Sequence, residues 1–148
     1  MEHVKTHEEL CIKIGLQESK YAGQTYLIIS DTFLLKPYEI VHNLLSKGIT
    51  KKSQIILAGQ HKYGMDELAF LKRNNIHFVP SHKILHNKIP KCDTVIIDTN
   101  CLDYAVLRNN NPGGLQLNEL QKIVPAHKKM YVLGNDKEYS LLTVHLNV

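Results

Sequence analysis

Residues 94–103 read Thr-Val-Ile-Ile-Asp-Thr-Asn-Cys-Leu-Asp, and the first half of this stretch decides the fold. Residues 94–97 form a β-branched run without polar alternation, which is typical of a strand buried on both faces of a parallel sheet. Residues 26–29, 54–58 and 76–79 have the same character, and helical patterns separate these runs. The alternation predicts an α/β fold with three layers, in which helices flank a mostly parallel sheet.

The connecting segments carry helix signals. Thr6 and Glu9 have the spacing of a capping box ahead of a helix whose inner stripe is expected to hold Leu10, Cys11, Ile14 and Leu16. Pro37 is expected to open a second helix that ends at Gly48, and Asp66 is expected to cap a third. A turn is predicted at residues 112–114, a helical face at 117–124, and two further strands at 130–133 and 143–146.

Size and composition indicate one globular domain. The chain has 148 residues, 43% hydrophobic and 22% charged, which is enough to bury one core over residues 1–148. No apolar run approaches the roughly 20 residues of a membrane span, and residues 1–20 contain no apolar signal core. We therefore expect a cytoplasmic protein without membrane contact.

Two classes of site are disfavoured by the cysteines and the charges. The sequence has an odd number of cysteines, Cys11, Cys92 and Cys101, and none of them form a C-x-x-C pair. This pattern argues against a disulfide framework or a thiolate zinc site. The net charge of +4 comes from scattered residues, with short basic pairs at 51–52 and 128–129. These pairs permit RNA binding but lack the dense basic stripe of a dedicated duplex-binding surface.

The common catalytic motifs of this architecture are absent from the sequence. It contains no G-x-G-x-x-G, no P-loop and no G-x-S-x-G elbow. His82 and His86 are four residues apart, a spacing that suits either a metal pair or solvated surface histidines. The strongest local feature is Asp98, Asn100 and Asp103 at a predicted strand end, where oxygen ligands suit a hard cation but where an Asp also commonly caps a turn.

The order of residues after this strand resembles the arginase–agmatinase (ureohydrolase) family. That family has a strand ending in Asp-x-Asp-x-x-Asp, then a loop with Gly-Gly-Leu, then a Glu four residues after the Leu. Here Asp98, Asn100 and Asp103 are followed by Gly113-Gly114-Leu115 and by Glu119. Two weaker similarities are Glu67, which fits a helix-leading Glu, and residues 133–138, which resemble the family's late Asp-x-x-Glu strand end.

The resemblance implies an arginase-like fold, and in the family's enzymes it implies two manganese ions. The family's Gly-Gly-Asp-His and Asp-x-His-x-Asp segments do not occur here, Asp31 keeps only the first Asp of the second, and Asn100 replaces an anionic ligand. Two close cations need several carboxylates to offset their repulsion. We therefore expect no catalytic residues and no cofactor. The vestigial metal candidates are Asp31, Asp98, Asn100, Asp103 and Glu119.

The resulting hypothesis is a truncated, catalytically inactive ureohydrolase-like domain that binds a macromolecular partner, either a protein or a ribonucleoprotein. A homo-oligomer is compatible with the same sequence. One alternative is an active manganese-dependent amidinohydrolase of the arginase or agmatinase type. Another is an unrelated α/β factor that binds RNA or the ribosome, for which the basic residues are the motivation.

Overall fold

The computed structural model describes residues 1–29, 37–50, 52–59, 64–80, 92–99 and 129–146. The elements in chain order are β1 (Glu2–Val4), α1 (His7–Lys20), β2 (Thr25–Ile29), α2 (Pro37–Asn43), the π-helix η1 (Leu44–Gly48), β3 (Gln54–Gly59), α3 (Met65–Arg73), β4 (Ile76–Pro80), β5 (Thr94–Asp98), β6 (Lys129–Leu133) and α6 (Asp136–Leu146).

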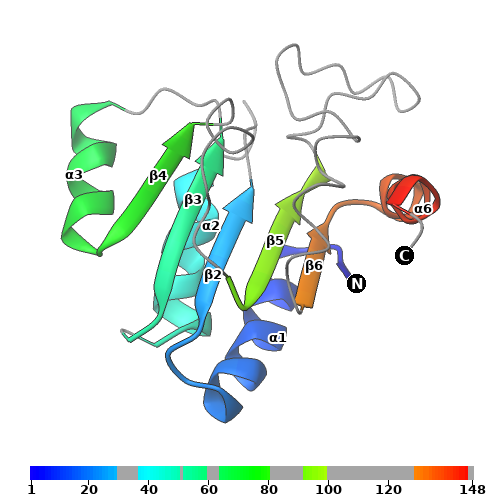
Figure 1. Cartoon of the computed structure of the whole chain (residues 1–148), viewed down its shortest axis with the longest axis horizontal. Helices are drawn as coiled ribbons and strands as arrows, with labels where there is room; N and C mark the ends of the chain where they lie inside the picture. Colours follow the sequence, from blue (N-terminus) through cyan, green and yellow to red (C-terminus); the bar gives the residue numbers. More distant parts are fainter. Residues whose placement is uncertain (30–36, 51, 60–63, 81–91, 100–128, 147–148) are drawn as a thin grey trace.

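The described strands form one six-stranded sheet in the order β1-β6-β5-β2-β3-β4, and every neighbouring pair is parallel (Figure 1). The chain runs outward from β2 to β3 and β4, and then returns to β5 on the other side of β2. The carboxyl ends of β2 and β5 therefore lie side by side where the chain changes direction, with Ile29 in register with Ile97. Open α/β sheets bind their ligands at such a position.

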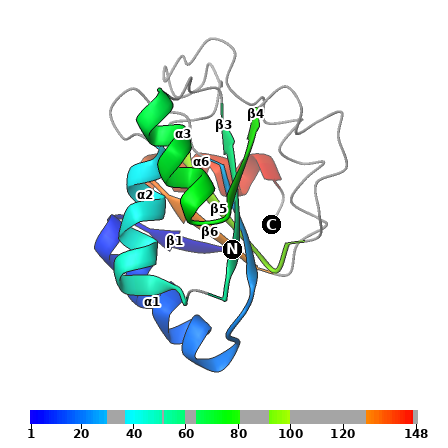
Figure 2. The ribbon, with the colours of Figure 1, turned by 90° about the vertical axis from the view of Figure 1, so that its left-hand side faces the viewer.

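Both faces of the sheet are buried, as the continuous apolar runs predicted. Helices α1, α2 and α3 lie on the same face of the sheet (Figure 2). Their apolar side chains form one core with alternate strand residues, including Leu10, Ile14, Ile40, Leu44, Tyr26, Ile28 and Ile96. The residues that point to the opposite face are also at most 1% exposed, namely Leu27, Ile29, Val95 and Ile97.

The helix signals in the sequence are mostly confirmed. The Thr6 hydroxyl accepts a hydrogen bond from the Glu9 backbone N–H at 3.1 Å, which caps α1. The second helical segment begins at Pro37 and ends at Gly48 as predicted, although its last five residues form a π-helix. The prediction that Asp66 caps the third helix is wrong: Gly64 is the N-cap, with an extended backbone, and Asp66 lies in the first turn.

Two other predictions differ from the structure, and one strand was not predicted. Residues 143–146, expected as a strand, belong to α6, because a short apolar run fits either structure by period alone. The strand β1 was not predicted, since three residues are too few to show a period. Leu16, expected on the buried stripe of α1, is 69% exposed. The predicted turn at 112–114 and the helical face at 117–124 lie outside the described residues.

Four parallel strands at the centre and buried residues at 26–29 and 95–97 are confirmed. In the part of the chain that the structure describes, no helix is both long and apolar enough to cross a bilayer.

Candidate functional site

The carboxyl edge of the sheet is where the sequence placed its candidate ligands. Asp98 is the last residue of β5, between β2 and β6, and its backbone is in register with Leu133. Its predicted position at a strand end is thus confirmed. The side chain of Asp98 lies outside the described part of the structure, as do Asp31, Asn100, Asp103 and Glu119.

Two side chains from different elements meet at this edge. Thr99 directly follows β5 and is fully buried. Its hydroxyl donates a short hydrogen bond to Oε2 of Glu138, in the first turn of α6. The end of β5 is therefore joined to the helix that follows β6.

The carboxylate of Glu138 has a second internal partner. Nδ2 of Asn135 donates to Glu138 Oε1 at 2.5 Å, and the Glu138 backbone N–H donates to Asn135 Oδ1 at 2.8 Å. Asn135 thereby caps the amino end of α6, and Glu138 closes the cap from the third position. Both oxygens of the carboxylate accept hydrogen bonds from neutral donors of the protein itself.

Gly134 allows this close approach. A Cβ atom at Gly134 would come within 2.5 Å of Thr99 Oγ1 and 2.7 Å of Thr99 Cγ2, a separation that real Cβ atoms do not show. Only glycine therefore lets the turn after β6 pass over the end of β5.

The same turn is held from the other side by β1. The Nε2–H of His3 donates to the Gly134 carbonyl at 2.6 Å, and its ring stacks on Tyr139 with centroids 4.4 Å apart. Asp136 lies 3.6 Å from Nδ1 of His3 and 3.1 Å from Nζ of Lys5. The first strand of the chain thus fixes the start of α6.

The described residues at this edge include side chains with oxygen atoms, but they do not form a metal-binding cluster. Among the residues that the structure describes, no three His, Cys, Asp or Glu side chains cluster closely enough to hold a metal ion. The described groups at this edge bind one another: the threonine hydroxyl and the asparagine amide both donate to the one carboxylate. Their evident role is to join strand ends and to start a helix.

The described cysteines do not offer a nucleophile either. Cys11 and Cys92 are both buried, as the sequence predicted for Cys11. Burial raises the pKa of Cys92 to about 11, with a smaller contribution from the charge of Asp93. Burial likewise raises the pKa of Cys11. Since the thiolate is the reactive form, burial disfavours the reactive state of both thiols.

Sequence reasoning missed Thr99 and Asn135 at this edge. Asn135 and Glu138 have the spacing of a helix cap, so this signal was present in the sequence. Thr99 had no signal of its own, because the partner it meets is 39 positions away. The histidine pair His82 and His86 lies outside the described residues.

Comparison with known proteins finds similarity only at the level of structure. No model of a known protein family matches the sequence, and no curated protein matches it. A quadruple mutant of the arginase-like protein of T. brucei matches with a TM-score of 0.64 and 15% identity, covering 95% of this chain and 54% of that one. A double mutant of the same protein matches with a TM-score of 0.59 and 14% identity, covering 88% and 52%.

The arginase of Helicobacter pylori matches with a TM-score of 0.52 and 12% identity, covering 97% of this chain and 68% of that one. At these identities the comparison shows the fold alone. The arginase-like fold that the sequence resemblance implied is confirmed. The chain spans about half the length of the T. brucei structures that it matches.

Proposed function

We propose that this chain is an arginase-like domain that does not carry out ureohydrolysis and that acts by binding another macromolecule. The observation that carries the proposal is the state of Glu138. It lies in the segment that resembles the family's late Asp-x-x-Glu strand end, yet both of its carboxylate oxygens accept hydrogen bonds from Thr99 and Asn135. The hydrogen bonds to this carboxylate support a role in capping α6 rather than in binding a metal ion.

The sequence supports the same proposal. A binuclear manganese centre needs several anionic ligands, and the sequence lacks two of the family's three ligand segments. In the remaining segment, Asn100 supplies a neutral oxygen where the family has an aspartate. The matching T. brucei protein is named arginase-like, and its quadruple mutant carries three serines changed to aspartate and one arginine changed to histidine. The three aspartates that these mutations introduce carry carboxylates, a type of ligand that suits manganese.

Helix α1 offers a surface for a partner. Ile12 and Leu16 are one helical turn apart and are 58% and 69% exposed. Two neighbouring aliphatic side chains on one exposed face bury apolar area when a partner covers them. Val144 on α6 is also 70% exposed, but it has no apolar neighbour one turn away with comparable exposure among the described residues.

The first experiment tests whether the protein binds manganese and hydrolyses arginine or agmatine. The purified protein is loaded with excess manganese and desalted, its metal content is measured, and hydrolysis of arginine and agmatine is assayed. We expect less than stoichiometric manganese and no urea formation. About two retained manganese ions, with urea formation that Asp98→Ala abolishes, would establish the enzyme instead.

The second experiment tests the binding role. The tagged protein is isolated from its own cells at moderate salt, and the mass of the native species is measured with and without nuclease. We expect a mass above that of the 16.9 kDa monomer, unchanged by nuclease, and lost in the double variant Ile12→Lys with Leu16→Lys. Val144→Lys is the matched control and should retain the complex.

A free monomer in every condition would contradict the binding role. A complex that disappears with nuclease would favour the ribonucleoprotein alternative.

A further inference from the structure

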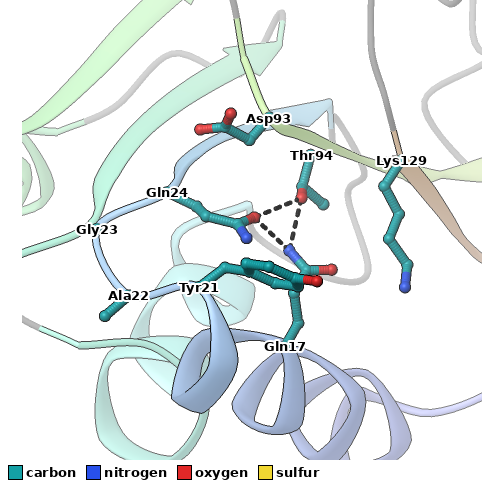
Figure 3. A pocket seen from close by; sticks show the side chains of 8 residues that line it. All are labelled: Gln17, Tyr21, Ala22, Gly23, Gln24, Asp93, Thr94 and Lys129. Carbon is teal, nitrogen blue, oxygen red and sulfur yellow. Dashed lines mark hydrogen bonds between the residues drawn. The ribbon is translucent and has the colours of Figure 1, made fainter.

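The amino-terminal edge of the sheet, opposite the edge described above, contains a hollow of about 570 Å³. Its volume lies within the range of small-molecule sites. The residues that shape it come from the last turn of α1 and from the starts of β2, β5 and β6: Gln17, Tyr21, Gln24, Asp93, Thr94 and Lys129 (Figure 3).

The floor of the hollow is a fixed network of polar side chains. Nε2 of Gln17 donates to Gln24 Oε1 at 2.5 Å and to Thr94 Oγ1 at 2.8 Å, and Thr94 Oγ1 donates to Gln24 Oε1 at 3.2 Å (Figure 3). The hydroxyl of Tyr131 donates to Gln17 Oε1 at 3.0 Å. Thr94 is fully buried. These four side chains hold one another in place before any ligand arrives.

One donor of this network is left over. Both hydrogen bonds that reach the Gln24 amide use its oxygen, so the oxygen is satisfied and the orientation of the amide is determined. The dashed lines that reach Gln24 in Figure 3 end on its oxygen, and its nitrogen donates to no acceptor among the described residues. A preorganised amide N–H₂ is therefore available to an acceptor in the hollow.

Two residues of opposite charge also line the hollow. Asp93 and Lys129 lie on either side of Thr94 (Figure 3). Oδ2 of Asp93 accepts the backbone N–H of Thr25 at 2.9 Å, which leaves Oδ1 to accept a further bond. Lys129, the register partner of Thr94 on β6, has its ammonium 3.5 Å from Glu2 Oε1. Such an exposed pair is weak, so the ammonium can still bind a phosphate.

The remaining wall is aromatic. The ring of Tyr21 borders the hollow and is 53% exposed, so one of its sides is available for stacking. An aromatic face beside fixed hydrogen-bonding groups is a combination that proteins use to hold nucleobases.

We propose that this hollow binds a nucleoside monophosphate whose base carries an exocyclic amino group. The base stacks on Tyr21, its ring acceptor takes the Gln24 amide proton, its amino group donates to Asp93, and the phosphate binds Lys129. An inorganic anion would use only Lys129, and a free aliphatic acid would leave Tyr21 and Gln24 without partners. This proposal does not rest on the macromolecular binding proposed above.

Cytidine and uridine monophosphate test the proposal, because they differ along one edge of the base: cytosine has an amino group and an unprotonated ring nitrogen where uracil has a carbonyl oxygen and a ring N–H. Each is titrated into ¹⁵N-labelled protein, and the side-chain amide signals of Gln24 and Gln17 are followed by NMR. We expect both signals to shift with cytidine monophosphate and the affinity for uridine monophosphate to be about tenfold lower.

Three variants assign the contacts. Asp93→Asn keeps the acceptor for Thr25 and should reduce the preference for cytidine, while Lys129→Gln should weaken binding about tenfold and Tyr21→Ala at least about fivefold. Lys72→Gln removes the same charge from α3 and should leave binding unchanged. No shift at millimolar nucleotide, or equal losses in Lys129→Gln and Lys72→Gln, would overturn the proposal. So would tight binding of inorganic phosphate alone.

Discussion

The most unusual single residue in the described core is a buried carboxylate. Glu18, in the last turn of α1, is only 2% exposed. Its oxygens accept short hydrogen bonds from Tyr26 and Ser53, a bond of 2.9 Å from Thr50, and a bond of 3.2 Å from the Gly23 backbone N–H. One side chain thereby ties α1 to β2 and to the turn that precedes β3.

These donors control the protonation of Glu18. Burial alone raises its pKa, but the hydrogen bonds from Ser53, Tyr26, Thr50 and Gly23 outweigh burial and lower the pKa below the ordinary 4.5. The carboxylate is therefore charged in the folded state. A group with a lowered folded pKa stabilises the fold above its unfolded pKa, and this contribution is lost as the pH falls through the folded pKa.

Glu18→Gln should consequently lower the free energy of unfolding at pH 7 by about 1–3 kcal/mol, since the amide cannot accept from all four donors. Its stability should also decline less than that of the natural protein as the pH falls below 4.5. Urea titrations at pH 7, 5, 4 and 3 measure both effects. Glu8→Gln, on the exposed side of the same helix, is the control. A Glu18→Gln variant with the natural acid slope would contradict this assignment.

At the scale of elements, most of the fold could be predicted because burial leaves a periodic signal. The strands at residues 26–29 and 94–97 are buried on both faces, so their apolar runs are uninterrupted. Thr6 and Pro37 marked helix starts through local chemistry. The short segment β1 had no such signal, and the end of α6 was predicted as a strand because Thr143 and Val144 are β-branched residues that favour strands.

The candidate site was harder to predict for a physical reason. Sequence placed Asp98 correctly, because a strand end follows from the strand itself. Contacts such as Thr99 with Glu138, or Gln17 with Thr94, depend on which strands become neighbours. That order is set by the topology of the sheet, which no local pattern encodes. The polar hollow at the amino edge was missed for the same reason.

The junction between β6 and α6 can be tested through its close contact. Gly134→Ala would push a Cβ to 2.5 Å from Thr99 Oγ1 and should lower the free energy of unfolding by about 1–3 kcal/mol. Thr99→Ala removes both of the nearest atoms, so the double variant should be less destabilised than the sum of the two single variants. Thermal unfolding of all four proteins measures the coupling.

Gly15→Ala serves as the control for this junction. Its nearest contact would be an ordinary 3.6 Å, inside a helix where alanine is preferred, so it should be neutral or stabilising. Strict additivity of Gly134→Ala and Thr99→Ala would show that the two residues do not interfere.

At the scale of the whole molecule, the two ends of the chain belong to one sheet. β1, at the start, pairs with β6, which lies near the end, and the Tyr139 hydroxyl of α6 donates to the Met1 carbonyl at 3.2 Å. β5 then pairs with β2, so strands from the second half of the sequence are inserted between strands of the first half. No cut in the sequence divides these strands into two separate sheets.

This interleaving predicts a single cooperative unfolding transition for the described core. The chain has seven tyrosines and no tryptophan, and the buried Tyr26 and Tyr131 lie on different strands, so tyrosine absorbance reports core packing while far-UV circular dichroism reports helices. Both should give the same urea midpoint.

His3→Ala removes the stack on Tyr139 and the bond to Gly134 at the β1 end. This variant should lower the urea midpoint equally for both probes. It should also lower the protection of the β3 amides against hydrogen exchange, although β3 lies far across the sheet. If β3 kept its protection while β6 lost it, the chain would consist of two units, and the single domain expected over residues 1–148 would be wrong.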